Sequence, residues 1–196
     1  PKLIVVDRAV PGEQQNYLTP EQHIPNEGLP YPWETCMTMA GSWSYVPNDV
    51  YKPTNELVEK LVDIVSKGGN YLLNIGPGPD GELDPTAYQR LKEIGAWLKV
   101  NGEGIYGSRM FTSFNEGDSI RYTQSKDGNT KYIFFFEFPT AKTVLTKINF
   151  SKKAKVQLLG SKEPVKWKST EQGTEINLSP KMKAATDHVW VLKVQG

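Results

Sequence analysis

The sequence changes its pattern close to Gly107, and this change constrains the fold more than any other feature. Before it, apolar runs of strand length alternate with longer runs that have helical spacing. After it, the runs are short and rich in β-branched and aromatic residues. The first pattern is typical of parallel βα units and the second of antiparallel sheets. The 196 residues suffice for two domains, which we predict to span residues 1–107 and 108–196.

Three apolar segments in the first part are predicted to be strands. The run "KLIVV" (2–6) is β-branched and ends abruptly in Asp7 and Arg8, so we expect a strand that is buried on both faces. Residues 33–39 ("WETCMTM") and 70–76 ("NYLLNIG") are the other two. A long loop is expected between the first and second strands. Because the sequence opens inside a strand and without Met, we interpret it as a fragment of a longer protein.

Two segments of the first part have the spacing of amphipathic helices. In the first, Thr54 is the expected N-cap and Gly68 the expected C′ residue. In the second, Asp84 is the expected cap and Pro85 the first helical residue. The apolar face predicted for this second helix consists of Tyr88, Leu91, Ile94, Trp97 and Leu98.

The second part of the sequence is predicted to be an all-β antiparallel sandwich without helices. Turn-forming residues at 126–129 and at Gly160 separate its short runs. The expected strands lie within residues 119–125, 131–138, 143–150, 155–160, 165–169, 174–179 and 188–195. Trp167 and Trp190 stand in alternating runs and are expected to be core residues.

Composition excludes several classes of function. The chain has 23 Lys and Arg against 22 Asp and Glu, so no basic stripe predicts nucleic-acid binding. No apolar run approaches the ~18 residues of a membrane span. Cys36 is the single cysteine, which rules out a disulfide within the chain. His23 and His188 lie in different halves, and we predict no metal site, no cofactor and no Ser-His-Asp triad.

Candidate functional residues follow the predicted strands. Asp7 and Arg8 end the first strand, Trp43 follows the second, Asn74 lies near the end of the third, and Glu21 lies in the long loop. Because the carboxyl ends of parallel strands share one edge, these side chains are expected to meet there. An acid, a cation and an aromatic ring together suit a sugar. Taken singly, each has a simpler interpretation: a surface ion pair for Arg8, core packing for Trp43, and a solvated acid for Glu21.

Glu21 and Glu34 compete for the role of a catalytic acid. Glu21 lies between Pro20 and Pro25, which are expected to restrict the loop and hold the carboxyl group ready. Glu34 begins its strand, so at ~3.3 Å per residue we expect it about 16 Å from the carboxyl ends of the strands. We therefore favour Glu21 as the proton donor and expect a structural role for Glu34.

Three blocks of the sequence resemble the α-L-fucosidases of glycoside hydrolase family 29. The blocks are residues 32–49 ("PWETCMTMAGSWSYVPND"), 61–83 ("LVDIVSKGGNYLLNIGPGPDGEL") and 90–109 ("RLKEIGAWLKVNGEGIYGSR"). The resemblance implies the carboxyl-terminal portion of a catalytic (β/α)8-like barrel in residues 1–107, followed by the family's β-sandwich in residues 108–196. It also suggests an extracytoplasmic location, either periplasmic, secreted or lysosomal.

The resemblance implies hydrolysis of terminal α-L-fucose from glycans with retained configuration. A retaining enzyme uses two carboxyl groups about 5–5.5 Å apart, one as nucleophile and the other as acid and base. The family's nucleophile is an Asp in a Trp-x-Asp type motif that this sequence lacks, so we expect it upstream. The alternative is an inactive carbohydrate-binding relative. For the sandwich, we favour a structural cap over a sugar-binding module.

The resemblance also assigns roles to individual residues. The loop "TPEQH" (19–23) is similar to the family's acid/base loop, which makes Glu21 the acid/base, with Glu34 as the alternative. Arg8 matches an arginine that contacts fucose, and Trp43 an aromatic that walls the sugar near its methyl group. Asp7 matches an acid beside this arginine, which the resemblance implies to be a positioning group. The implied partner is a fucosylated glycan. The sequence predicts neither the linkage preference nor the oligomeric state.

Overall fold

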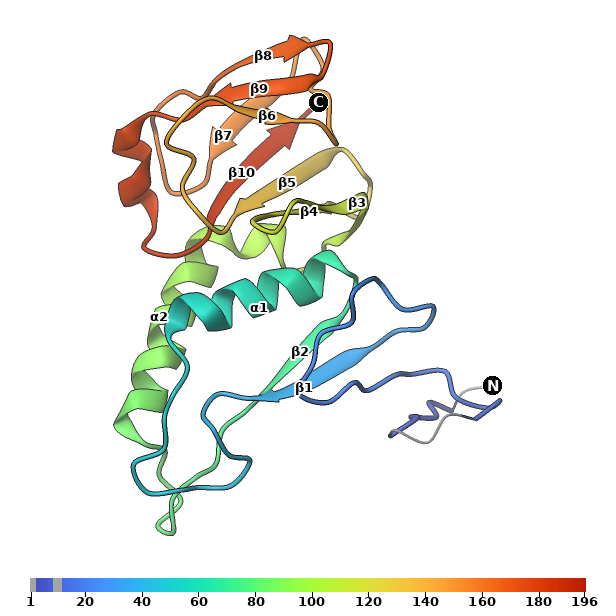
Figure 1. The fold of residues 1–196 in the computed structure, drawn as a ribbon, viewed down its shortest axis with the longest axis vertical. Helices are drawn as coiled ribbons and strands as arrows, with labels where there is room; N and C mark the ends of the chain where they lie inside the picture. The colour runs from blue at the N-terminus through green and yellow to red at the C-terminus, as the bar shows by residue number, and fades with distance from the viewer. Residues whose placement is uncertain (1–2, 9–11) are drawn as a thin grey trace. The chain divides into compact units, whose positions relative to one another are not determined.

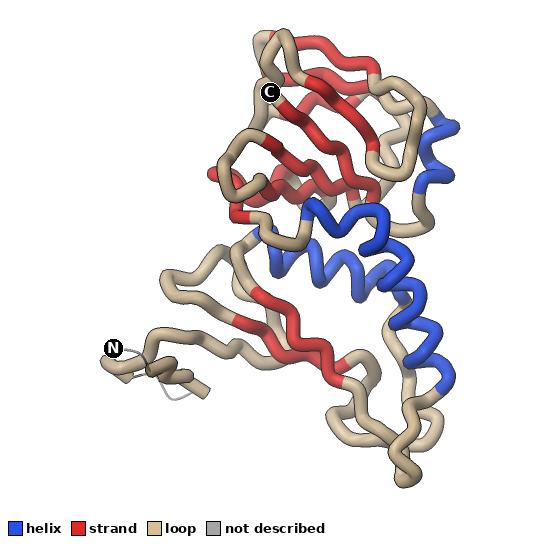
Figure 2. Tube along the Cα trace, turned by 180° about the vertical axis from the view of Figure 1, so that it is seen from behind, coloured by secondary structure: helices blue, strands red, loops and turns tan. Residues whose placement is uncertain are grey.

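The computed structural model describes residues 3–8 and 12–196, which form two compact units, Pro1–Gly95 and Ala96–Gly196 (Figures 1 and 2). In chain order, the change from helices to strands falls between η1 (Gly102–Gly104) and β3 (Arg109–Glu116). The helix that precedes it, α2 (Pro85–Asn101), begins in the first unit and ends in the second.

The first unit contains two parallel strands. β1 (Glu34–Thr38) pairs with β2 (Asn70–Asn74), with Glu34 opposite Asn70 and Thr38 opposite Asn74. Both strands lie inside the predicted runs, and their parallel pairing confirms the βα pattern expected of this half. α1 (Thr54–Ser66) provides the connection that parallel pairing requires.

The segment around Glu21 (residues 17–23) is a loop, as predicted, and isolated bridges tie it to β1 and to the residue before β1. Leu18 forms a parallel bridge with Trp33, and Glu21 forms one with Cys36. A further parallel bridge joins Val6 to Tyr17. Tyr17, Leu18 and Glu21 belong to none of the strands, so the loop prediction is confirmed, but the loop runs alongside β1. These bridges join residues that are distant in the sequence, so the loop's own polar residues and proline did not predict them.

The run 2–6 does not form the doubly buried strand that we predicted. Residue 2 lies outside the described residues, Leu3 and Ile4 are 69% and 72% exposed, and Val6 is 39% exposed. Burial on both faces requires neighbouring layers, and the described residues do not supply them here. They do not close into a barrel either, so the barrel remains a prediction.

The first helix confirms one predicted cap and corrects the other. Gly68 has φ +80°, the left-handed conformation expected of a C′ glycine. The N-cap, however, is Pro53, which forms no side-chain capping bond. Thr54 is instead buried in the first turn, and its hydroxyl donates a hydrogen bond to Glu93 of α2.

The start of α2 is as predicted. The Asp84 carboxylate accepts a hydrogen bond of 2.8 Å from the Thr86 amide, and Pro85 is the first helical residue. The rule that proline suits the first turn, where its missing N–H is no loss, accounts for this start.

The buried face of α2 differs in part from the predicted one. Tyr88 and Leu91 are 50% and 39% exposed, contrary to expectation. Ile94 and Trp97 are confirmed, since Ile94 packs against the cluster around Met39 and Leu57 and Trp97 is 3% exposed, and Ala87 joins that cluster without having been predicted.

The second unit has two antiparallel sheets, which confirms the predicted class of this half. The five-stranded sheet has the order β3-β4-β5-β10-β7, and the three-stranded sheet the order β6-β9-β8. All seven predicted runs contain a strand, whereas β3 was not predicted. The strands that follow β3 are β4 (Ile120–Gln124), β5 (Thr130–Phe135), β6 (Thr143–Leu145), β7 (Lys155–Leu158), β8 (Lys166–Thr170), β9 (Gly173–Asn177) and β10 (Trp190–Gln195). A short 3₁₀ helix, η2 (Pro180–Ala185), also departs from the expectation of no helices.

The core of the second unit lies between these sheets. Tyr122, Ile133 and Leu192 from the larger sheet join Leu145 and Ile176 from the smaller one in a single apolar cluster. Two tryptophans belong to this core, as predicted. Trp190 is 8% exposed, and the Trp167 ring packs edge-on against Phe150 with centroids 5.4 Å apart.

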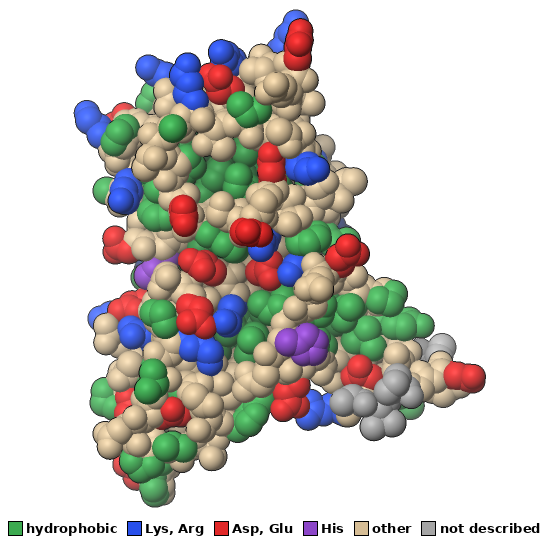
Figure 3. Space-filling model, viewed as in Figure 1, with side chains coloured by type: hydrophobic (Ala, Val, Ile, Leu, Met, Phe, Trp, Pro, Cys, Tyr) green, Lys and Arg blue, Asp and Glu red, His purple; other side chains and the backbone are tan. Residues whose placement is uncertain are grey.

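The nearly neutral total charge conceals an asymmetry between the two units. Residues 1–95 carry 13 Asp and Glu against 7 Lys and Arg, whereas residues 96–196 carry 9 against 16. Blue Lys and Arg side chains are accordingly prominent on the visible face of the second unit, at the top of Figure 3. The expectation that the chain does not bind nucleic acid was based on the total charge, and it stays a prediction.

Candidate functional site

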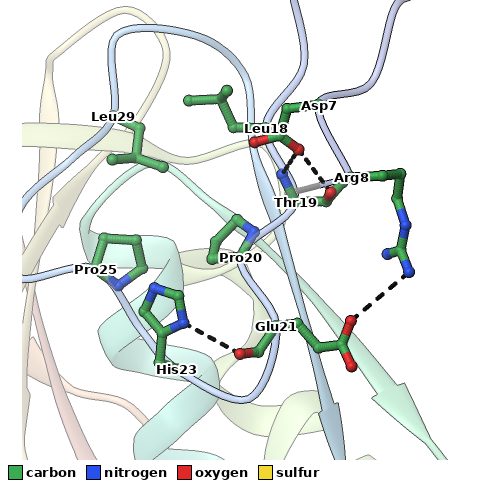
Figure 4. Close-up of a pocket in the computed structure, with 9 residues that line it drawn as sticks. All are labelled: Asp7, Arg8, Leu18, Thr19, Pro20, Glu21, His23, Pro25 and Leu29. Atoms are coloured by element: carbon green, nitrogen blue, oxygen red, sulfur yellow. Dashed lines mark hydrogen bonds and ion pairs between the residues drawn. The ribbon is translucent and has the colours of Figure 1, made fainter. Parts of the chain in front are cut away.

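A pocket of about 460 Å³ lies between residues 7–8 and the loop of residues 18–29 (Figure 4). It brings Asp7, Arg8 and Glu21 together, three of the residues singled out in the sequence. The complete lining is Asp7, Arg8, Leu18, Thr19, Pro20, Glu21, His23, Pro25 and Leu29. Figure 4 shows the Glu21 carboxylate turned towards Arg8, and Pro25 and Leu29 on the other side of the view.

Asp7 joins the two segments that form the pocket. One of its carboxylate oxygens accepts hydrogen bonds from the Thr19 amide at 3.0 Å and from the Thr19 hydroxyl at 2.8 Å. Its own amide donates to the Tyr17 carbonyl at 3.2 Å. Asp7 thus fixes the backbone two residues before Glu21. The sequence suggested a positioning role for Asp7 but did not identify Thr19 as its partner.

Arg8 and Glu21 form an ion pair at the pocket. The guanidinium and carboxylate are 3.7 Å apart, and the side chains are 65% and 50% exposed. Exposed pairs contribute little to stability. Arg8 also has φ +37°, in the region that non-glycine residues rarely adopt. Strained backbone of this kind occurs preferentially at functional sites, and it supports a role for Arg8 in binding rather than in folding.

The backbone on both sides of Glu21 is anchored to one residue of β1. The Cys36 amide donates to the Pro20 carbonyl at 3.1 Å, and the Gln22 amide donates to the Cys36 carbonyl at 2.9 Å. The His23 ring nitrogen Nδ1 lies 3.1 Å from the Glu21 carbonyl. Backbone pairing therefore holds Glu21 in addition to the two prolines to which we attributed its rigidity.

Glu34 lies closer to Glu21 than we predicted. The estimate of about 16 Å assumed that the functional residues stand beyond the end of β1, but Glu21 is level with Cys36, two residues from Glu34. At ~3.3 Å per residue this is only about 7 Å along the strand. Burial raises the pKa of the Cys36 thiol, the Glu21 and Glu34 carboxylates raise it further, and Arg8 lowers it.

Other contacts distinguish the two carboxylates. Glu21 pairs with Arg8 and lines the pocket, whereas Glu34 does not line it. Glu34 instead acts on the Tyr17 phenol, whose pKa is raised first by burial and then by this carboxylate. We retain Glu21 as the predicted acid/base for these reasons, and not because of strand length.

Trp43 and Asn74 do not line this pocket. Trp43 is 39% exposed in the segment that follows β1. Asn74 ends β2, and its buried side-chain oxygen accepts no hydrogen bond from the described residues. The proposed contact of Trp43 with a sugar therefore stays a prediction.

Two further properties concern the described residues as a whole. No three or more of their His, Cys, Asp and Glu side chains gather where a metal ion could be held. None of their helices combines the length and apolar character needed to cross a membrane.

Comparison with known families gives two matches that together span most of the chain. Residues 1–103 match the family model described as "Alpha-L-fucosidase". Residues 115–195 match the model described as "Alpha-L-fucosidase C-terminal domain". The two matches correspond to the βα half and the β-rich half of the sequence.

Curated relatives share about a third of their residues with this chain. Plasma alpha-L-fucosidase of Homo sapiens is 36% identical over 170 residues, which cover 80% of this chain and 35% of the relative. Tissue alpha-L-fucosidase of Bos taurus is 33% identical over 181 residues, which cover 87% of this chain and 38% of the relative. The chain therefore spans little more than a third of the length of these relatives.

Solved structures show the same fold. The Thermotoga maritima alpha-fucosidase in complex with a mechanism-based inhibitor is 31% identical, with a TM-score of 0.82 over 98% of this chain and 45% of that one. Alpha-L-fucosidase isoenzyme 1 from Paenibacillus thiaminolyticus is 29% identical, with a TM-score of 0.80 over 92% of this chain and 45% of that one.

Proposed function

The chain belongs to the α-L-fucosidase family, and from this premise we propose that it is the carboxyl-terminal part of a retaining exo-α-L-fucosidase. Its substrates would be glycans that end in α-L-fucose. The observation that carries the proposal is the pairing of Arg8 with Glu21 in one pocket, next to Asp7. This pocket offers a proton-transferring carboxyl group beside a cation that can bind sugar hydroxyls.

The proposed reaction has two steps. In the first, a carboxylate supplied by sequence before residue 1 attacks the anomeric carbon of fucose, and the glycosidic C–O bond breaks. Glu21 gives its proton to the leaving oxygen. In the second step Glu21 takes a proton from water, the water oxygen attacks the anomeric carbon, and the enzyme carboxylate leaves. Two displacements at one carbon retain its configuration.

Arg8 has two states in this proposal. A salt bridge with Glu21 requires an ionised carboxylate, whereas proton donation requires a protonated one. We infer that fucose hydroxyls replace Glu21 as the partner of Arg8 when substrate binds. The exposure of both side chains, 65% and 50%, is compatible with such an exchange because little buried packing must be broken.

Substitution of Glu21 tests this assignment. In the full-length protein, Glu21→Gln should lower kcat/KM for a natural fucosylated glycan by roughly 10²–10⁴-fold, the usual contribution of a general acid. An aryl fucoside with a good leaving group needs no protonation, so formation of its fucosyl-enzyme should change much less. Added azide should restore turnover of that aryl fucoside, because it replaces water without needing a base.

Glu27→Gln is the matched control, since Glu27 is an exposed glutamate in the same part of the chain. It should leave both substrates unaffected. The assignment would be contradicted if Glu21→Gln cleaved the glycan at the wild-type rate. It would also be contradicted if Glu34→Gln, and not Glu21→Gln, showed the dependence on the leaving group. A wild-type protein that binds fucose but releases none would identify an inactive carbohydrate-binding relative.

A further inference from the structure

We propose that Gln22 is a positioning residue for the Glu21 carboxyl group, and that Thr38 and Lys52 hold Gln22 in place. The inference rests on the proposed function, in which Glu21 is the acid/base. The three positioning residues come from the segment around Glu21, from the end of β1 and from the stretch before α1. None of them lines the pocket.

Gln22 is attached to β1 through both its backbone and its side chain. Its amide donates to the Cys36 carbonyl at 2.9 Å. Its side-chain amide spans Thr38: Nε2 donates to the Thr38 hydroxyl at 3.3 Å, and Oε1 accepts from the Thr38 amide at 3.4 Å. The residue that follows Glu21 is thus tied to β1 at two positions on the strand.

Thr38 is itself fixed by contacts that use its full hydrogen-bonding capacity. It is 2% exposed, and its hydroxyl donates to the Ala40 carbonyl at 2.6 Å. The same hydroxyl accepts from Gln22 and, at 3.3 Å, from the Lys52 ammonium. A hydroxyl offers one donor and two acceptor sites, so all are occupied, and such satisfied networks are rigid.

Lys52 completes the network. Its ammonium group also donates to the Thr38 carbonyl at 2.6 Å and to the Ala40 carbonyl at 2.9 Å. These two carbonyls and the Thr38 hydroxyl match the three donors of an ammonium group. Burial lowers the pKa of Lys52, as expected for a cation removed from water and bound to neutral oxygens.

The backbone conformation of Gln22 explains why its contact with Thr38 should affect the position of Glu21. Gln22 has φ +58°, the left-handed conformation that a glutamine seldom adopts. Without the contact to Thr38, the strain can relax by a change at residue 22 that also turns the Glu21 side chain. Misplacing a catalytic group by about 1 Å can cost ~10²-fold in rate.

The experiment uses full-length Gln22→Ala and Gln22→Asn with a pair of aryl fucosides, one with a good and one with a poor leaving group. Asn keeps the amide and tolerates the left-handed conformation, but it is one methylene too short to reach Thr38 as Gln22 does. For both variants we expect kcat/KM to fall roughly 10–100-fold with the poor leaving group. With the good leaving group the loss should stay within about threefold, and KM should hardly change, because only proton transfer is misaligned.

Thr38 provides rescue and control variants. Thr38→Val should reproduce the effect of Gln22→Ala, and Thr38→Ser should restore most of the rate because it keeps the hydroxyl. Thr123→Val is the matched control, since Thr123 is fully buried and donates to the Gly104 carbonyl at 2.8 Å in the other unit. It should lower the melting temperature without any leaving-group dependence.

Equal losses on both substrates, or rates like wild type in both Gln22 variants, would overturn the inference. This failure differs from failure of the proposed function. If Glu21→Gln shows leaving-group dependence and the Gln22 variants do not, only the positioning role is wrong. If Glu21→Gln itself shows none, both are wrong, because Glu21 is then not the acid that Gln22 would position. If Thr38→Val does not fold, the two Gln22 variants still test the positioning role of Gln22.

Discussion

At the scale of single residues, the candidate site combines neighbours with opposite roles. Asp7 makes two hydrogen bonds to Thr19 and belongs to the framework of the pocket. Arg8, the next residue, makes an exposed ion pair and has a strained backbone. Polar groups with hydrogen-bond partners stabilise a structure, whereas residues with strained backbones occur preferentially at functional sites. Stability measurements should therefore separate these two residues.

A double-mutant cycle of Asp7→Ala and Thr19→Val tests the framework role. Each single change should lower the free energy of unfolding by about 1–2 kcal/mol, because it leaves a partly buried group without its partner. The two effects should be non-additive by about 0.5–1.5 kcal/mol, as for residues in contact. Urea unfolding measures all four proteins. Asp7→Ala with Thr170→Val, which lies in the other unit, should be additive.

Glu116, in the second unit, is another carboxylate with well-defined partners. It accepts hydrogen bonds from Tyr122 at 2.6 Å and from the amide and hydroxyl of Thr146 at 2.9 and 2.8 Å. Burial alone would raise the pKa of Glu116, but the hydrogen bonds from Tyr122 and Thr146 outweigh it, so the pKa lies below its ordinary value of 4.5. Glu116→Gln should cost about 1–3 kcal/mol at pH 7.

The pH dependence of that loss follows from the direction of the pKa shift. A carboxyl group with a lowered folded-state pKa contributes stability above its unfolded pKa, and this contribution is lost as the pH falls through the folded value. The difference between wild type and Glu116→Gln should thus be constant near neutrality and shrink below about pH 4.5. Exposed Glu137 provides the control substitution, Glu137→Gln. A loss that is independent of pH would assign the stabilisation to packing.

At the scale of elements, the sequence predicted correctly those strands and helix ends that depend on their own residues. β1, β2 and the start of α2 carry their own apolar runs and caps, and they form where expected. The segment around Glu21 is polar and contains Pro20, so its pairing with β1 could not be predicted from its own residues. The contact of Gln22 with Thr38 has the same origin, because 16 residues separate the two in the chain.

Replacing each of two glycines in or beside helices by alanine should change the stability of the protein in opposite directions. Gly68 follows α1 with φ +80°, so Gly68→Ala should cost about 1 kcal/mol. Gly95 lies inside α2, and a Cβ there would meet no atom within 4 Å. Gly95→Ala should therefore stabilise the protein by about 0.5–1 kcal/mol. Thermal unfolding measures both; a destabilising Gly95→Ala would show that this site needs the flexibility of glycine.

At the scale of the whole molecule, the parallel segments leave large apolar side chains exposed. Leu3 and Ile4 are exposed, and Leu72 of β2 is 48% exposed. Exposed apolar patches commonly mark surfaces that another part of a protein covers. The family relatives are more than twice as long as this chain, and their remaining strands are what we expect to cover these residues.

Leu72→Ala tests this expectation by comparing two lengths of the protein. In residues 1–196 alone, the change should alter the free energy of unfolding by no more than about 0.5 kcal/mol, as for other exposed positions. In the full-length protein it should cost about 2–3 kcal/mol if the side chain is buried in a barrel. Equal and small effects in both proteins would argue against a barrel closed over β2.

The most direct measurement is a structure of the full-length protein with an uncleaved fucoside bound at the pocket. We predict that the Glu21 carboxyl group lies within hydrogen-bond distance of the glycosidic oxygen, with Arg8 on the fucose hydroxyls and a carboxylate from upstream sequence facing the anomeric carbon. Glu34, or any other carboxyl group, at the glycosidic oxygen while Glu21 faces solvent would contradict the account.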